Sequence, residues 1–142
     1  MIIISKAQIT DLDEIVAVDS EVIGSKARSS IIREAIKTGQ CLAAKENDTV
    51  GGFLIYNLHF FECTFISLVI VSPPQRRRGY ASRLIESMFH HSPTPKIFSS
   101  TNRSNLAMQR VFAACGFQPS GIVENLDEGD PELIYFKRIA KE

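Results

Sequence analysis

One stretch of the chain, residues 67–89, constrains the fold more than any other, because it reads as a strand, a basic turn and a helix. Residues 68–71 form a short apolar, β-branched run that is typical of a buried strand. Pro73 and Pro74 follow, and because proline has no N–H group to donate, they end the strand. After Gly79 the apolar residues recur with helical spacing, at Ala81, Leu84, Ile85 and Met88.

The turn between this strand and this helix has the properties of an anion-binding site. A helix N-terminus carries unpaired backbone N–H groups, and the helix dipole favours negative charge there. Three consecutive arginines, residues 76–78, add positive charge, and Gly79 allows the backbone to approach a ligand closely. The turn therefore predicts a site for a diphosphate group. It matches neither the P-loop, since no G-K-[ST] follows the glycine, nor the dinucleotide fingerprint G-x-G-x-x-G.

The charge balance favours a small anion over a nucleic acid as the ligand of this turn. The 16 basic and 16 acidic residues give a formal net charge of zero at pH 7. A protein that holds nucleic acid through its phosphates usually carries a net positive face. Two alternatives stay open for the turn itself: an ordinary β–α turn with solvated arginines, and a nucleic-acid-binding patch.

Length and composition describe one globular domain. The 142 residues can bury a sizeable core, and 44% apolar with 23% charged residues is ordinary for a globular protein. We see no repeat or linker, so we expect a single domain over residues 1–142. The apolar run at residues 1–4 is too short for a signal peptide or a membrane span. Cys41, Cys63 and Cys115 lie in or beside apolar runs, so we expect free thiols, as in a reducing cytoplasm.

The remaining sequence alternates between strand and helix patterns. We predict strands at residues 2–7, 41–45, 50–58, 65–71, 96–100, 120–125 and 133–138. We predict helices at residues 12–23, 29–37, 80–91 and 105–115. Asp11, with Glu14 three residues later, is the expected cap of the first helix, and Ser29 or Ser30 that of the second. This order predicts an α/β (α+β) fold, a mixed but mostly antiparallel central sheet of about six or seven strands flanked by about four helices.

The basic turn resembles the acetyl-CoA signature of the GNAT superfamily of N-acetyltransferases, and the element order resembles the GNAT fold. The signature [QR]-x-x-G-x-[GA] is present as Arg76-Arg77-Arg78-Gly79-Tyr80-Ala81, after a V-x-P in Val71-Ser72-Pro73. A second marker, N-x-x-A-x-x-[LV]-Y-x-x-x-G-F, falls on residues 105–117. Asn105, Val111, Gly116 and Phe117 match it, while Met108 replaces the alanine and Phe112 the tyrosine. The resemblance covers nearly the whole chain and is weakest over the first two helices.

The resemblance implies an acetyl-CoA-dependent N-acetyltransferase that transfers the acetyl group directly to a primary amine in a ternary complex. The amides of residues 76–81 would hold the pyrophosphate. The backbone of Val69 and Val71, on the fourth strand, would pair with the pantetheine arm, which enters where the fourth and fifth strands splay apart, and Asn105 would hydrogen-bond the arm. The amide of Val69 or Ile70 would polarise the thioester carbonyl. The implied cofactor-binding residues are Val69, Ile70, Val71, Arg76, Arg77, Arg78, Gly79, Tyr80, Ala81, Ser82, Asn105 and Phe112.

The catalytic residues stay unassigned. In many relatives a tyrosine at the position of Phe112 protonates the departing thiolate, and phenylalanine has no proton to give. Other candidate donors, which we do not rank, are Ser67, Ser99, Ser100, Thr101 and Tyr135. Some relatives carry a glutamate on the fourth strand as the general base. Here Phe65 stands nearest that position and cannot serve, and Glu62 precedes the strand. We therefore expect a base that acts through water.

The acyl acceptor is also open, and a small amine, an amino acid, an antibiotic or a protein terminus all fit. Four carboxylates in the loop between the last two strands are either part of a solvated turn or a group that attracts a cationic amine: Asp127, Glu128, Asp130 and Glu132.

We expect no metal, nucleic-acid or membrane partner, and a homodimer stays open. Two other functions remain as alternatives: a non-catalytic acyl-CoA-binding regulator and a nucleic-acid-binding module. His59, His90 and His91 are expected at the surface, and Cys115 in the core.

Overall fold

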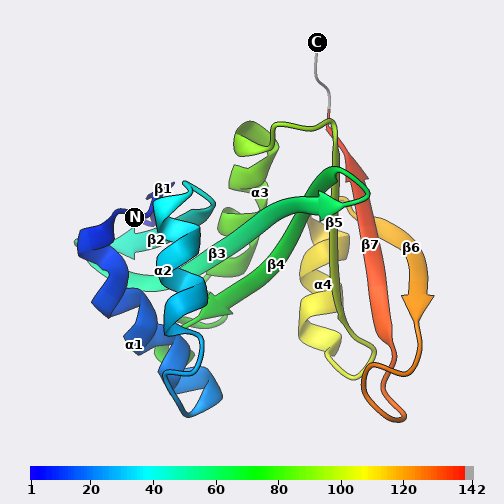
Figure 1. The fold of residues 1–142 in the computed structure, drawn as a ribbon, viewed down its shortest axis with the longest axis horizontal. Helices are drawn as coiled ribbons and strands as arrows, with labels where there is room; N and C mark the ends of the chain where they lie inside the picture. Colours follow the sequence, from blue (N-terminus) through cyan, green and yellow to red (C-terminus); the bar gives the residue numbers. More distant parts are fainter. Residues whose placement is uncertain (140–142) are drawn as a thin grey trace.

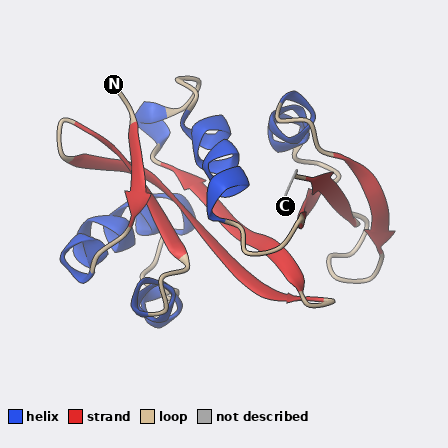
Figure 2. Ribbon diagram, turned by 90° about the horizontal axis from the view of Figure 1, so that it is seen from above, coloured by secondary structure: helices blue, strands red, loops and turns tan. Residues whose placement is uncertain are grey.

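The computed structural model describes residues 1–139, which form one seven-stranded sheet with helices on both faces (Figures 1 and 2). The strands are β1 (Ile3–Lys6), β2 (Cys41–Glu46), β3 (Thr49–Phe60), β4 (Cys63–Val71), β5 (Lys96–Asn102), β6 (Gln118–Val123) and β7 (Glu132–Arg138). The α-helices are α1 (Leu12–Ile23), α2 (Ser29–Lys37), α3 (Tyr80–His91) and α4 (Leu106–Ala114). The predicted order of elements is confirmed, with strand ends displaced by a few residues.

The sheet has the order β1-β2-β3-β4-β5-β7-β6, and all neighbours pair antiparallel except β4 and β5. The parallel pair is connected through α3, as a crossover between parallel strands requires. One apolar core lies between the sheet and α1 and α2, where Ile15, Ile32 and Phe53 are fully buried. The other lies beneath α3 and α4, around Leu84 and Met88. The predicted mixed, mostly antiparallel sheet is therefore confirmed.

Asp11 occupies the predicted N-cap position of α1, but its side chain makes no capping hydrogen bond with the helix. It ends a short 3₁₀ turn and has helical dihedral angles. Its carboxylate instead accepts the N–H of Gln8 at 2.8 Å and pairs with the ammonium of Lys45 at 2.7 Å. Glu14, expected in a capping box, accepts the N–H of Val50 at 3.2 Å. These carboxylates fasten the start of α1 to the sheet, a role set by tertiary contacts rather than by local sequence.

The second helix also begins without the expected cap. Its N-cap is Arg28, and the hydroxyl of Ser29 donates to the carbonyl of Lys26 at 2.7 Å. The guanidinium of Arg28 forms an ion pair with the buried carboxylate of Asp19 on α1, at 2.6 Å. The entry to α2 is thus held by a contact between the two helices.

A bulge in β4 at Ser67 changes which face its side chains occupy. Ile55 on β3 pairs with Leu68, whereas the next residue, Tyr56, pairs with Ile66, so Ser67 is an extra residue in the ladder. An extra residue reverses the alternation of a strand. Accordingly Ile66 packs in the core beneath α3 and α4, and Leu68 packs against the core beneath α1 and α2.

The strands β4 and β5 separate just beyond this bulge. Their pairing runs from Thr64 opposite Ile97 to Ile66 opposite Ser99 and ends there. The predicted splay between the fourth and fifth strands is therefore confirmed. It leaves residues 67–71, the second half of β4, with a neighbour on one side only, within the described part of the chain.

Candidate functional site

The separation of β4 and β5 opens a slot of about 330 Å³ through the sheet. Residues 66–70 of β4 and residues 99–102 of β5 form its two long walls. The remaining lining residues are Asn105, Met108, Phe112 and Glu132. Since α4 lies on one face of the sheet and the side chain of Glu132 on the other, the slot can be approached from both faces.

The edge of β4 that borders the slot carries backbone groups available to a ligand. The N–H of Ser72 donates to the carbonyl of Gly51 on β3 at 2.9 Å. Backbone groups alternate in direction along a strand, so those of Ile70 also face β3, whereas those of Val69 and Val71 face the slot. An extended ligand can therefore pair with Val69 and Val71 as an added strand. Of the two amides predicted to polarise a carbonyl, that of Val69 faces the slot.

The turn before α3 presents a row of backbone N–H groups. Among the described residues, the amides of residues 77–82 find no acceptor, and the first that does is Arg83, which donates to the carbonyl of Gly79 at 3.0 Å. Gly79 has a φ of 86° and Arg77 a φ of 65°, both in the left-handed region. Successive N–H groups in such a turn form a concavity that suits an anion. This geometry fits a diphosphate site, but the row is displaced by one residue from the predicted residues 76–81, because the N–H of Arg76 donates to the carbonyl of Pro73 at 3.3 Å.

The three arginines of the turn differ in their surroundings. The guanidinium of Arg78 pairs with the carboxylate of Glu46 at 2.8 Å and lies 5.9 Å above the ring of Tyr80. Tyr80 is 2% exposed, and its hydroxyl also donates to Glu46, at 2.9 Å. The hydrogen bond from Tyr80, helped by the charge of Arg78, lowers the pKa of Glu46 below its ordinary value. Arg78 therefore holds the turn against β2, and its side chain, 46% exposed, adds to the positive charge of the exposed residues 76–77.

Four of the hydroxyls considered as proton donors line the slot, but three already donate within the protein. Ser67 donates to a carbonyl of β3 at 3.2 Å, and Ser99 to a carbonyl of β4 at 2.8 Å. Ser100 donates to the carboxylate of Glu132 at 2.7 Å. Among the described residues, the hydroxyl of Thr101 has no such acceptor. The structure thus ranks candidates that the sequence left equal.

The α4 side of the slot is apolar. Phe112 is fully buried, and its ring stacks on that of Tyr135 with centroids 4.9 Å apart. Tyr135, the fifth candidate donor, is outside the slot lining. Asn105 caps α4 by accepting the N–H of Met108 at 3.1 Å. Asn105 also lines the slot, and among the described residues its carboxamide NH₂ group has no acceptor.

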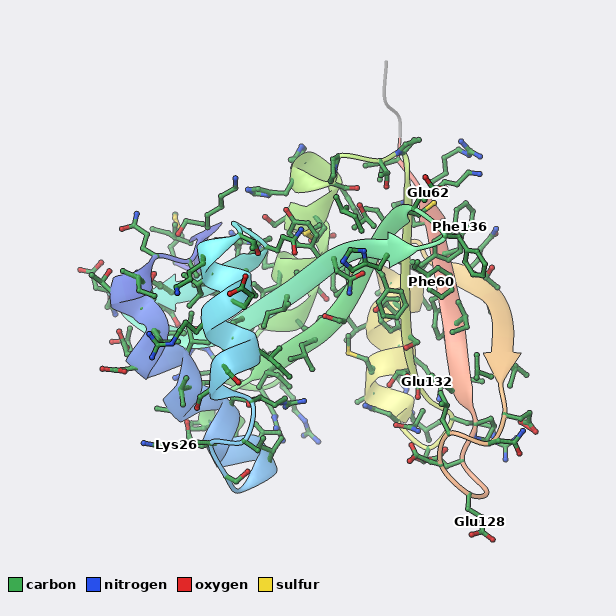
Figure 3. All side chains as sticks on the ribbon, in the orientation of Figure 1. Lys26, Phe60, Glu62, Glu128, Glu132 and Phe136 are labelled. Atoms are coloured by element: carbon green, nitrogen blue, oxygen red, sulfur yellow. The ribbon has the colours of Figure 1, made fainter. Side chains whose placement is uncertain are left out.

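The four carboxylates near the C-terminal end have different roles (Figure 3). Asp127 accepts a hydrogen bond from Asn102 at 2.9 Å, and Asp130 accepts two from the turn after β5, at 2.6 and 3.0 Å. These bonds fasten the loop before β7. Glu128 is exposed at the loop tip, whereas Glu132, the first residue of β7, lines the slot. The sequence grouped the four together, and only the pairing of β5 with β7 separates them.

The remaining polar candidates stand apart from the slot. Burial raises the pKa of the Cys41 thiol to about 12 and also raises that of Cys115, and both side chains are buried. Cys63 is half-buried, and Glu62 lies in the turn between β3 and β4 (Figure 3). Over residues 1–139, no three His, Cys, Asp or Glu side chains are grouped so that they could hold a metal ion. No helix in the same range is long and apolar enough to cross a membrane.

Comparisons with known proteins agree with the fold. The model of the acetyltransferase (GNAT) family matches residues 9–117. An acetyltransferase of the GNAT family from Bacillus cereus ATCC 10987 is 55% identical, with a TM-score of 0.97 over 99% of both chains. No curated protein matches the sequence.

Two more distant structures share the fold. The ribosomal-protein-S18-alanine N-acetyltransferase of Escherichia coli is 16% identical, with a TM-score of 0.85 over 100% of this chain and 96% of its own. The protein yncA of Salmonella typhimurium, solved with its cofactor acetyl-CoA, is 13% identical, with a TM-score of 0.82 over the same shares. At these identities the likeness concerns the fold alone.

Proposed function

Because this chain belongs to the GNAT acetyltransferase family, we propose that it transfers an acetyl group from acetyl-CoA to a primary amine by direct attack in a ternary complex. The observation that carries the proposal is the row of amides at residues 77–82, which find no acceptor among the described residues and follow, along the chain, the strand β4 that lines the slot. Acetyl-CoA supplies an activated acetyl group at the end of a long arm that begins at a diphosphate. Residues 1–142 would act as a single catalytic domain, in the cytoplasm, where the three free cysteines would stay reduced.

The cofactor-binding residues fall into two groups in this proposal. The amides of residues 77–82, with the exposed guanidinium groups of residues 76–77, neutralise and hold the diphosphate. The backbone of residues 69–71 pairs with the arm, the carboxamide of Asn105 hydrogen-bonds it, and Phe112 provides an apolar wall. The arm is then directed into the slot between β4 and β5.

Catalysis in this arrangement depends mainly on placement. Holding two reactants in near-attack geometry lowers a barrier by roughly 7–11 kcal/mol. The N–H of Val69 points into the slot and can polarise a carbonyl there. Among the described residues, Thr101 carries the slot hydroxyl that has no acceptor, and it can donate to a departing thiolate, the role that Phe112 cannot fill. Direct attack by the amine needs no acyl-enzyme. The thiols of Cys41 and Cys115 are poor nucleophiles, because they are buried and have raised pKa values.

A non-catalytic acyl-CoA-binding protein is the second candidate, because Phe112 removes the proton donor that many relatives use. The test is a thiol-release assay with acetyl-CoA across a panel of primary amines, together with calorimetry of acetyl-CoA binding. We expect micromolar binding and amine-dependent thiol release. Binding without release for any amine would favour the non-catalytic protein. Absence of binding, with affinity for nucleic acid that falls steeply with salt, would contradict both.

A further inference from the structure

Four phenylalanines, Phe60, Phe65, Phe98 and Phe136, form a continuous row of rings on the sheet, here called the phenylalanine row. The ring centroid of Phe60 lies 5.0 Å from that of Phe65 and 4.9 Å from that of Phe98. Phe136 continues the row, 5.2 Å from Phe98. All four rings are partly exposed, and none belongs to either apolar core. The row is therefore not required to fill the described interior.

No described helix covers this part of the sheet. The helices α1 and α2 lie over β2, β3 and β4, and the half formed by β5, β7 and β6 is bare on this side (Figures 1 and 3). Phe60 and Phe136 both lie at that half in Figure 3. Exposed aromatic groups that adjoin one another are a common mark of a binding surface.

The phenylalanine row and Glu132 share one face of the sheet. Leu133 and Tyr135 pack in the core beneath α3 and α4, so by alternation Glu132, Ile134 and Phe136 occupy the opposite face. At about 3.3 Å per residue, the backbones of Glu132 and Phe136 are about 13 Å apart. Ser100, whose hydroxyl reaches the carboxylate of Glu132, lies between them on the neighbouring strand.

Glu132 is the carboxylate in the slot lining. It accepts one hydrogen bond, from Ser100, and has no ion-pair partner among the described residues. A carboxylate has about four acceptor sites, so Glu132 can still bind an ammonium group. Asp127 and Asp130, in contrast, accept hydrogen bonds from Asn102 and Ser104 and fasten the loop before β7.

We propose that the acceptor is a primary amine attached to an aromatic or other apolar group. Its ammonium is held by Glu132 at the mouth of the slot and loses a proton to water before the neutral amine attacks the thioester and the thiolate of coenzyme A departs, and its apolar part lies on the phenylalanine row. This inference rests on the proposed function. It assigns the acceptor to the face opposite α4, so that amine and acyl donor meet from the two sides of the sheet. A polyamine fits less well, because the slot lining offers one carboxylate rather than several.

The test compares 2-phenylethylamine, ethylamine and spermidine as acceptors at saturating acetyl-CoA. We expect kcat/KM to be at least about tenfold higher for 2-phenylethylamine than for the other two. Glu132→Gln, which retains the acceptor for Ser100, should raise the KM for 2-phenylethylamine about tenfold or more, and Glu128→Gln, the same change at the exposed loop tip, should leave it unchanged. Phe136→Ala and the milder Phe136→Leu should reduce the preference for 2-phenylethylamine over ethylamine.

Acetyl-CoA affinity, measured by calorimetry on each variant, separates the two levels of the proposal. If wild-type protein binds and turns over acetyl-CoA but shows no preference for the apolar amine, or if Glu132→Gln has wild-type KM, this inference is wrong and the proposed function stands. If wild-type protein does not bind acetyl-CoA, the proposed function is itself wrong. Sedimentation that shows a dimer dissociated by Phe136→Ala would assign the row to a subunit interface and overturn the inference.

Discussion

Thr101 is the slot hydroxyl that has no acceptor in the described structure, and this gives it a predicted role at the residue scale. Thr101→Val keeps the shape of the side chain and removes the donor. The loss of one hydrogen bond to a developing thiolate, a charged acceptor, costs about 1.5–3 kcal/mol, so kcat should fall by roughly tenfold or more while acetyl-CoA affinity is retained. Steady-state kinetics with calorimetry checks this, with Thr49→Val at the exposed start of β3 as control. An unchanged kcat would remove Thr101 from the mechanism.

The cysteines provide a second prediction at this scale. Cys115 is 6% exposed and packs in the core, and burial raises the pKa of its thiol. Cys63 begins β4, outside the slot lining. Cys115→Ala and Cys63→Ala should therefore keep near wild-type kcat. An acetylated cysteine that forms and decays fast enough to support turnover, detected by mass spectrometry, would contradict direct transfer.

At the scale of single elements, Asp11 connects the start of α1 to β2. Its contribution to the free energy of unfolding depends on pH. Burial alone would raise the pKa of Asp11, but the N–H of Gln8 and the ammonium of Lys45 outweigh burial and lower it below 3.8. A carboxyl group with a lowered folded-state pKa stabilises the protein above its unfolded pKa, and this stabilisation is lost as pH falls through the folded value.

Asp11→Asn should therefore lower the free energy of unfolding at pH 7, on the order of 1 kcal/mol for one charge-assisted contact. The difference from wild type should shrink below pH 4, where the wild-type carboxylate becomes protonated. Urea unfolding at pH 7 and at several values below pH 4 measures both. A difference that is the same at every pH would show that the charge of Asp11 does not stabilise this joint.

The individual elements were largely predictable because their signals are local. Gly24 and Gly116 follow α1 and α4 with left-handed φ values of 80° and 87°, and such glycines are visible in the sequence. The side-chain contacts at the start of α1 were not predictable, because Asp11 and Glu14 bind partners more than 30 residues away. The bulge at Ser67 was also hidden, since the run around it is apolar on both sides of the strand.

At the scale of the whole molecule, one part of the candidate site was predictable from the sequence and the other part was not. The turn before α3 is continuous in sequence, so its prolines, arginines and glycine predicted it. Glu132 and Phe136 share a face by alternation along β7, but the rest of the phenylalanine row joins them only through strand register, since Phe98 is opposite Phe136 in the ladder of β5 with β7. No local pattern specifies that register, because α4 and β6 lie between the two strands in the chain. The acceptor side of the site was therefore visible only in the structure.

The central claim is that the turn at residues 77–82 binds acetyl-CoA, and a pair of glycine variants tests it directly. Gly79 and Gly24 both have left-handed backbones, with φ values of 86° and 80°, and a Cβ on either would meet no protein atom within 4 Å. Valine should therefore strain both backbones similarly. Only Gly79 lies where a ligand would approach the backbone.

Titration calorimetry of acetyl-CoA with wild type, Gly79→Val and Gly24→Val is the decisive measurement. The account predicts that Gly79→Val loses at least about tenfold in affinity, because a β-branched side chain blocks close approach and displaces the neighbouring amides. Gly24→Val, at the far end of α1, should bind as wild type does. Wild-type affinity in Gly79→Val would contradict the claim that this turn holds acetyl-CoA.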